Sequence, residues 1–298
     1  MQGPNSEMPI GVFDSGIGGL TVMKEIITRL PHEHIIYAGD TAMVPYGVRS
    51  AETVIRYSLE MAGFLAEKGI KLLVIACNTA SAFALTAIQE RFDIPVIGVI
   101  EPGAKGALQA TRSKKIGIIG TEGTIKSNSY VNAINKLYGG RPVTIREHGT
   151  ICYDRYFEVN LADFVIYTKA CPLFVPLAEE GWESSDVAVL TAEHYLEGLR
   201  KEPIDTLVLG CTHYPLLKGV ISRVMGGNVL LIDSAQETVK EIRENLVRHG
   251  IARTSSSEAM RAFYVTDVPE KFIKTGERFL GQKIERIEKI DIGGFDAA

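Results

Sequence analysis

Two cysteines stand out because each follows a short apolar run and precedes a residue suited to begin a helix. The runs are Leu73-Val-Ile-Ala-Cys77-Asn-Thr-Ala and Leu207-Val-Leu-Gly-Cys211-Thr-His-Tyr. In both, a stretch of strand length ends at a small residue, and Asn or Thr follows the cysteine. This pattern predicts a thiol at the carboxyl end of a buried parallel strand, where open α/β sheets bind ligands. A following helix would direct its positive end at the thiol and favour the thiolate.

The alternatives for these cysteines are a buried core residue, a metal ligand and a nucleophile. Free cysteine is commonly buried, but the repeated context of Cys77 and Cys211 favours function, whereas Cys152 and Cys171 lack it. Cys211 and His213 alone supply two ligands where structural zinc needs four, so we expect no metal. Residues two apart at a helix start seldom face each other, so we interpret His213 as a neighbour that tunes the thiol or delivers a proton.

Two thiols in matching positions suit the inversion of a carbon centre by proton exchange. That reaction needs a base on one face of the carbon and an acid on the other, with the roles exchanged in the reverse direction. The sequence contains no pyridoxal-phosphate or nucleotide motif, so we expect no cofactor. Hydrogen-bond donors around a substrate carboxylate would then stabilise the carbanion in a closed, dry site.

Composition narrows the class of protein. The 298 residues suffice for two domains, and 46% hydrophobic with 23% charged residues is typical of a soluble globular chain. A net charge of -4 gives no basic surface for nucleic acid. No apolar stretch approaches the roughly 20 residues of a membrane span, and four cysteines without a CxxC pair favour a reducing, cytoplasmic setting.

Strands and helices alternate along the first part of the chain. Apolar runs predict strands at 10–13, 34–38, 73–76 and 95–100, and helices at 20–30 and 51–68.

The first strand ends in Asp14-Ser-Gly-Ile-Gly-Gly19, whose backbone N-H groups would suit a carboxylate. Asp14 is interpreted as a turn cap or as a site carboxylate, and we favour the second because of its position. Tyr46, in a Pro-Tyr-Gly turn, either packs or presents its hydroxyl and backbone to a ligand.

The same pattern starts again at Lys115. Strands are expected at 115–119, 206–209 and 229–232, a weak strand at 143–147 would match the second one, and 148–167 is expected to be a surface excursion. An edge strand at 262–266 and a helix at 270–280 would end the chain. We therefore predict an α/β fold of two similar doubly wound parallel-sheet domains related by pseudo-symmetry, with a site in the cleft between them. The predicted domains are residues 1–103 with 236–298, and residues 104–235.

Four motifs together resemble glutamate racemases, in the aspartate/glutamate racemase family. They are Gly11-Val-Phe-Asp-Ser-Gly-Ile-Gly-Gly19, Gly39-Asp-Thr41 with Val44-Pro-Tyr-Gly47, Ala76-Cys-Asn-Thr-Ala-Ser81, and Gly210-Cys-Thr-His-Tyr-Pro-Leu-Leu217. The resemblance runs from about residue 9 to residue 280. It implies cofactor-independent interconversion of L- and D-glutamate, which would supply D-glutamate for peptidoglycan and cell shape, in a cytoplasmic homodimer.

The resemblance also implies roles for particular residues. Cys77 would act on the D-isomer with Asp14 as its assistant, and Cys211 on the L-isomer with His213. A family glutamate near the second thiol corresponds to Glu179, favoured over Glu180. The implied substrate contacts are Asp14, Ser15, Tyr46, Gly47, Asn78, Thr79, Thr212 and His213, with Thr121 and Thr124 as further candidates.

Three rival functions remain open from the sequence. An aspartate racemase would share the two-cysteine plan, and an assay of both amino acids separates the two. A protein that binds an amino acid without turnover would leave the substrate's alpha proton in place. A thiol hydrolase would form a covalent acyl intermediate.

Overall fold

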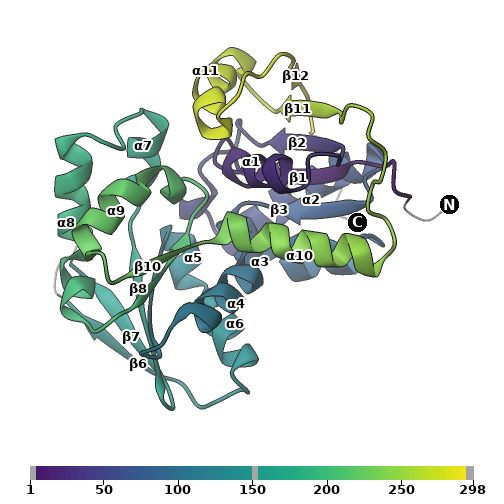
Figure 1. Ribbon diagram of the computed structural model, residues 1–298. Helices are drawn as coiled ribbons and strands as arrows, with labels where there is room; N and C mark the ends of the chain where they lie inside the picture. The colour runs from purple at the N-terminus through teal and green to yellow at the C-terminus, as the bar shows by residue number, and fades with distance from the viewer. Residues whose placement is uncertain (1–4, 150–153, 293–298) are drawn as a thin grey trace. The chain divides into compact units, whose positions relative to one another are not determined.

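The computed structural model describes residues 5–149 and 154–292, which form two units of parallel β-sheet and helices. One unit comprises Met1–Val99 and Thr238–Ala298, and the other comprises Ile100–Glu237 (Figure 1). The chain therefore leaves the first unit after β4 and returns to it within α10.

The first unit is built on a six-stranded sheet with the order β12-β11-β2-β1-β3-β4. All of its strand pairs are parallel. Its elements are β1 (Ile10–Asp14), α1 (Leu20–Arg29), β2 (Ile35–Gly39), a 3-10 turn (Tyr46–Val48), α2 (Ala51–Glu67), β3 (Leu72–Ile75), α3 (Asn78–Arg91), β4 (Val96–Gly98), α10 (Ser234–Arg248), β11 (Arg261–Val265), α11 (Pro269–Leu280) and β12 (Glu288–Lys289).

Burial explains why the strands of the first unit read as continuous apolar runs. Every residue of β1, β2 and β3 is buried, because helices cover both faces of a parallel sheet. A hydrophobic core cluster of this unit includes Phe13, Leu73, Tyr46 and Cys77. The two residues with predicted chemical roles are thus anchored in well-packed surroundings.

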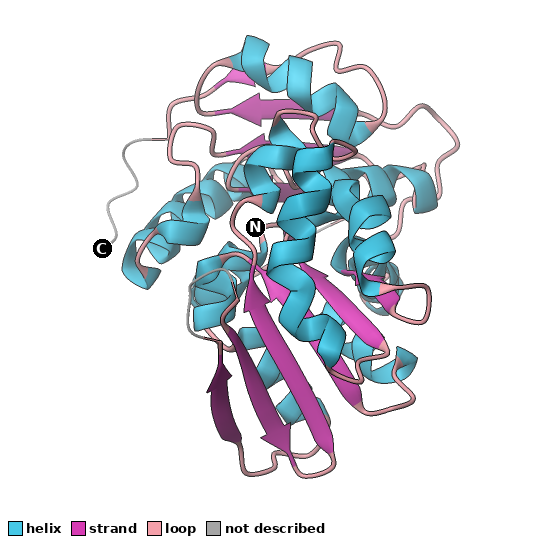
Figure 2. Cartoon of the chain, turned by 90° about the vertical axis from the view of Figure 1, so that its left-hand side faces the viewer, coloured by secondary structure: helices cyan, strands magenta, loops and turns pink. Residues whose placement is uncertain are grey.

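The second unit also has a six-stranded sheet, with the order β10-β9-β5-β8-β7-β6. Figure 2 shows helices, in cyan, packed against its long strands, in magenta. Its elements are α4 (Ile100–Ala110), β5 (Lys115–Gly120), α5 (Glu122–Lys126), α6 (Ser129–Leu137), β6 (Thr144–His148), β7 (Tyr156–Leu161), β8 (Phe164–Ala170), α7 (Phe174–Glu179), α8 (Asp186–Lys201), β9 (Thr206–Gly210), a 3-10 turn (Tyr214–Leu217), α9 (Lys218–Met225) and β10 (Leu230–Asp233).

The two sheets contain the same four-stranded parallel core. The order β2-β1-β3-β4 in the first unit corresponds to β8-β5-β9-β10 in the second. The predicted repetition of the α/β pattern is therefore confirmed. The thiol-bearing strand, β3 or β9, neighbours the first strand of its own unit in both cases.

Two expectations for the second unit are wrong. The strand near residue 143 is β6, an exposed edge strand antiparallel to β7, and it does not match β2. The stretch 148–167 is not a surface excursion where it is described, because β7 and the start of β8 lie in it; residues 150–153 lie outside the described residues. The match to β2 is β8, which is almost entirely buried beside β5.

Candidate active site

The first group of predicted site residues gathers where three parallel strands of the first unit end. The register places Asp14 opposite Gly39, and Phe13 opposite Ile75. The backbone N-H of Asp40 donates to the Asp14 carbonyl at 3.1 Å, which extends the ladder by one residue. Asp14, Asp40 and Cys77 therefore emerge at one edge of the sheet.

Cys77 itself is the N-cap of α3, one residue before the capping residue that the sequence predicted, Asn78. Its Sγ accepts a hydrogen bond from the backbone N-H of Ala80 at 3.4 Å and lies 3.6 Å from the Oγ of Ser15. The side chain is buried next to the positive end of a 14-residue helix. A thiolate at this position is stabilised by the helix N-H groups and the helix dipole.

Asp14 caps the turn that follows β1. Its Oδ1 accepts from the backbone N-H of Gly16 at 3.1 Å, and the side chain is fully buried. The Gly16 carbonyl in turn accepts from the hydroxyl of Tyr37, a buried residue that sequence reasoning did not select. Gly39 permits the close approach, since a Cβ there would lie 2.5 Å from the Gly16 oxygen. The Asp14 side chain therefore caps this turn, which is one of its two interpretations. It also lies at the end of a parallel strand, where α/β proteins place their sites.

Other predicted contacts of this group lie in the same region. Asn78 and Thr79 form the first turn of α3 and are both buried. Tyr46 and Gly47 lie in the 3-10 turn, and the Tyr46 hydroxyl donates to Asp40 Oδ2 at 2.6 Å. The hydroxyl of Tyr46 is therefore directed onto a buried carboxylate of the protein.

The second group of predicted site residues gathers at the carboxyl ends of β5, β8 and β9. Gly120 pairs with both Ala170 and Gly210, so Thr121, Cys171 and Cys211 follow three adjacent strands. Thr121 caps α5 by accepting from the backbone N-H of Thr124 at 3.2 Å, and the two threonine hydroxyl oxygens are 3.0 Å apart. The hydroxyls thus form a polar pair at the start of a helix.

Cys211, His213 and Glu179 form a connected row of side chains. The Cys211 Sγ lies 3.8 Å from His213 Nδ1, and His213 Nε2 lies 3.0 Å from Glu179 Oε1. The prediction that Cys211 and His213 do not face each other is therefore wrong. They face each other because the chain after β9 makes turns and then a 3-10 turn, and α9 begins only at Lys218. Glu179, the last residue of α7, is the carboxylate that contacts the imidazole.

The electrostatics of His213 differ from those of an isolated histidine. Burial acts to lower its pKa, but hydrogen bonds and negative charge from Cys211 and Glu179 raise the pKa to about 10. The ring is therefore held as an imidazolium when Cys211 is a thiolate. Because no long helix begins at Cys211, this cation supplies the positive charge that α3 supplies beside Cys77. Thr212, also buried, lies 3.4 Å from His213 Nδ1 through its Oγ1.

Cys171 does not share the surroundings of Cys77 and Cys211. Cys171 is fully buried, and burial raises the pKa of its thiol well above the ordinary value. Cys152 lies outside the described residues. Within residues 5–149 and 154–292, no group of three or more His, Cys, Asp or Glu side chains is arranged to hold a metal ion.

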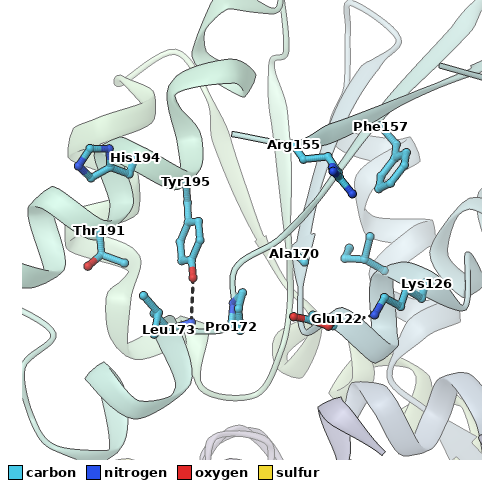
Figure 3. A pocket seen from close by; sticks show the side chains of 11 residues that line it. Glu122, Lys126, Arg155, Phe157, Ala170, Pro172, Leu173, Thr191, His194 and Tyr195 are labelled. Carbon is cyan, nitrogen blue, oxygen red and sulfur yellow. Dashed lines mark hydrogen bonds and ion pairs between the residues drawn. The ribbon is translucent and has the colours of Figure 1, made fainter. Parts of the chain in front are cut away.

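A cavity of about 650 Å³ in the second unit lies apart from the Cys211 row. Figure 3 shows its walls, which come from α5, β7, α8 and the segment after β8. Ile125, Phe157 and Tyr195 are among its lining residues, and none of the lining residues is a predicted site residue. The charged Lys126 on its wall is paired with Glu122 at 3.0 Å. Cavity size alone therefore does not identify the chemistry of this unit.

The sequence profile of the Asp/Glu/Hydantoin racemase family matches residues 10–242, and the fold is the two-domain α/β fold of solved glutamate racemases. The chain belongs to this family. It is an isomerase of the racemase class, as predicted from the sequence.

Several of the similar proteins are glutamate racemases. The chain is 53% identical to a glutamate racemase of Geobacter metallireducens, over 95% of this chain and 96% of the relative. A crystal structure of a Bacillus anthracis glutamate racemase matches with a TM-score of 0.85 and 40% identity, covering 96% of this chain and 98% of that one. The Francisella tularensis glutamate racemase in complex with D-glutamate matches with a TM-score of 0.84 and 36% identity, covering 97% and 99%. The predicted resemblance and fold class are confirmed.

The structure also bears on membrane association. Among the described residues, no helix is both long enough and apolar enough to span a bilayer.

Proposed function

We propose that this chain interconverts L- and D-glutamate by proton exchange between two thiols, Cys77 and Cys211. The observation that carries the proposal is their placement at the same point of two matching sheets, directly after β3 and β9. The names of its close relatives support glutamate as the substrate.

Each turnover moves two protons. One thiolate removes the alpha proton of glutamate, and the electron pair left on the carbon forms a carbanion. The opposite thiol then donates its proton to the other face of that carbon, which yields the enantiomer and a new thiolate. Exchange with solvent returns the two sulfurs to their starting protonation states. Cys211 serves as base for the L-isomer, and Cys77 serves as base for the D-isomer.

The neighbours of each thiol fit these steps. Beside Cys211, the buried imidazolium of His213 stabilises the thiolate and is held by Glu179. Beside Cys77, the N-terminus of α3 stabilises the thiolate, and Asp14 is the assisting carboxylate. We propose that these groups together bind and act on glutamate.

Local donors hold the substrate, because the chain has a net negative charge. In the first unit the candidates are the backbone of the Tyr46–Gly47 turn and the side chains of Ser15, Asn78 and Thr79. In the second unit they are Thr121, Thr124, Thr212 and His213. Fixed donors around a carboxylate stabilise the negative charge that develops as the alpha proton leaves.

The cellular role is proposed from the family resemblance. D-glutamate formed in the cytoplasm would be used in peptidoglycan synthesis, and the enzyme would act as a homodimer. Sedimentation analysis of the purified protein tests the dimer, with a monomer mass as the contrary result.

The decisive assay uses pure L-glutamate without added cofactor. Circular dichroism should show loss of optical activity, and a parallel sample with L-aspartate should change far more slowly. Faster conversion of aspartate would assign the rival specificity. Tight binding of glutamate without any conversion would indicate a binding protein and refute the proposal.

A further inference from the structure

The loop that carries the Tyr46–Gly47 turn is held by a buried carboxylate. Tyr46 is 1% exposed, and its hydroxyl donates to Asp40 Oδ2 at 2.6 Å. The other carboxylate oxygen, Oδ1, accepts from the Thr266 hydroxyl at 2.9 Å. Asp40 is itself 1% exposed, and it forms no ion pair with another described residue. Two hydroxyl donors, together with the backbone N-H of Met43, therefore satisfy a carboxylate that is shielded from water.

Asp40 also connects this loop to the first strand end. Its backbone N-H donates to the carbonyl of Asp14 at 3.1 Å. One residue thus joins the Asp14 turn to the Tyr46 turn, and both contain predicted contacts of glutamate.

Thr266 belongs to the returning segment of the chain, directly after β11. Its hydroxyl oxygen accepts from the backbone N-H of Ala42 at 2.9 Å, and its own N-H donates to the Gly39 carbonyl at 3.2 Å. Next to it, Thr41 donates to the Asp267 carbonyl at 2.6 Å and accepts from the Asp267 N-H at 2.8 Å. The end of β11 therefore fixes the loop from Gly39 to Ala42 through backbone and side-chain bonds.

We propose that Asp40 and Thr266 are positioning residues that hold the Tyr46–Gly47 turn so that its backbone binds a glutamate carboxylate. The Tyr46 hydroxyl serves this internal link and does not contact the substrate. The inference rests on the proposed racemase function and assigns a role to a segment that lies 226 residues further along the chain.

Two variants each remove one hydroxyl from the link, Tyr46→Phe and Thr266→Val. Each should raise KM for both enantiomers roughly tenfold, the order expected when a hydrogen bond to a charged group is lost, while kcat stays within about twofold. Because both hydroxyls act through Asp40, the double variant should raise KM by less than the product of the single effects.

Two control variants test whether the effect comes from the hydroxyl of Thr266 and not from other changes in this segment. Thr266→Ser retains the hydroxyl and should restore KM to near the parent value. Tyr264→Phe removes a hydroxyl from β11 that makes no hydrogen bond to another described residue, and it should leave kinetics unchanged. Thermal unfolding of each variant checks that the fold is intact, and Thr266→Val carries the test if Tyr46→Phe does not fold.

The outcomes separate this inference from the proposed function. If the parent protein racemises glutamate but Tyr46→Phe and Thr266→Val keep its KM, the positioning role is refuted alone. A loss of kcat with unchanged KM would also refute it and would instead place these groups in proton transfer. If the parent protein does not racemise glutamate, both the proposed function and this inference fail.

Discussion

The imidazole of His213 lies 3.0 Å from the carboxylate of Glu179, through Nε2 and Oε1. The opposite ring nitrogen faces the Cys211 sulfur at 3.8 Å. A cation held between a thiol and a carboxylate stabilises the thiolate without a long helix behind it. The two thiols of this chain are thus supported by different means, a helix N-terminus for Cys77 and an imidazolium for Cys211.

Glu179→Gln should weaken the support of Cys211. Without the carboxylate charge the pKa of His213 falls, so the ring loses its proton at lower pH and the alkaline limb of the rate profile moves to lower pH. Glu179 is 36% exposed, so we expect only about a two- to fivefold loss of rate near pH 8. Initial rates across pH measure the shift, and an unmoved alkaline limb would contradict it.

The same variant tests which thiol serves which enantiomer. The enantiomers have equal free energies in water, so kcat/KM must fall equally in both directions for any variant. A difference between the two thiols should therefore appear in the primary deuterium isotope effect on the rate. This isotope effect should rise for alpha-deuterated L-glutamate, from which Cys211 removes the deuteron, and not for the D-isomer. A larger rise for D-glutamate would exchange the roles of Cys77 and Cys211.

Gly19→Ala should disturb the Asp14 turn. The added Cβ would lie 2.5 Å from the Asp14 Cβ and 3.0 Å from the Ala76 Cβ, so the turn must move. We expect a loss of about 1–3 kcal/mol in unfolding free energy and a clear loss of racemisation. Gly219→Ala in α9 is the matched control, because no heavy atom lies within 4 Å of its new Cβ. Equal effects of the two substitutions on melting temperature and rate would refute this account of Gly19.

Asp205 should contribute to stability in a pH-dependent way. Burial opposes its ionisation, but hydrogen bonds from the Thr111 hydroxyl at 2.6 Å and from the Ser113 and Arg112 N-H groups hold its pKa well below 3.8. A depressed folded-state pKa gives stability that is present above the unfolded value and is lost as pH falls. Asp205→Asn should thus cost about 1 kcal/mol near pH 7, since the group is partly solvated, and the difference should shrink below about pH 4. Melting temperatures across pH measure it, and a constant difference would be the contrary result.

The sequence predicted the positions of the chemistry better than the layout of the second sheet. The thiols follow strands whose apolar runs are unmistakable, and parallel strands place their ends at one edge. The strand β8 was missed because β7 and β8 form an antiparallel hairpin that interrupts the βα alternation. Its connection, Ala162-Asp163, has Ala162 at φ 56°, and it lacks the glycine or asparagine that marks most such turns.

Contacts between segments that are far apart in the sequence could not be predicted either. Asp40 was visible in the Gly39-Asp-Thr41 motif, but its partner Thr266 comes from the other end of the chain, and no local spacing joins the two. The contact of His213 with Cys211 depends on turns that precede the 3-10 segment, where sequence alone suggested a helix start. By contrast, the choice of Glu179 over Glu180 agrees with the contact observed, because Glu179 reaches the imidazole.

The most direct test of the two-thiol mechanism is racemisation of L-glutamate in heavy water by the parent protein and by Cys77→Ala and Cys211→Ala. The parent should form D-glutamate that carries deuterium at the alpha carbon, because the donating thiol exchanges with solvent. Each variant should lose at least about 100-fold in rate while its far-ultraviolet circular dichroism stays unchanged. Near-parental racemisation by either variant would contradict the mechanism.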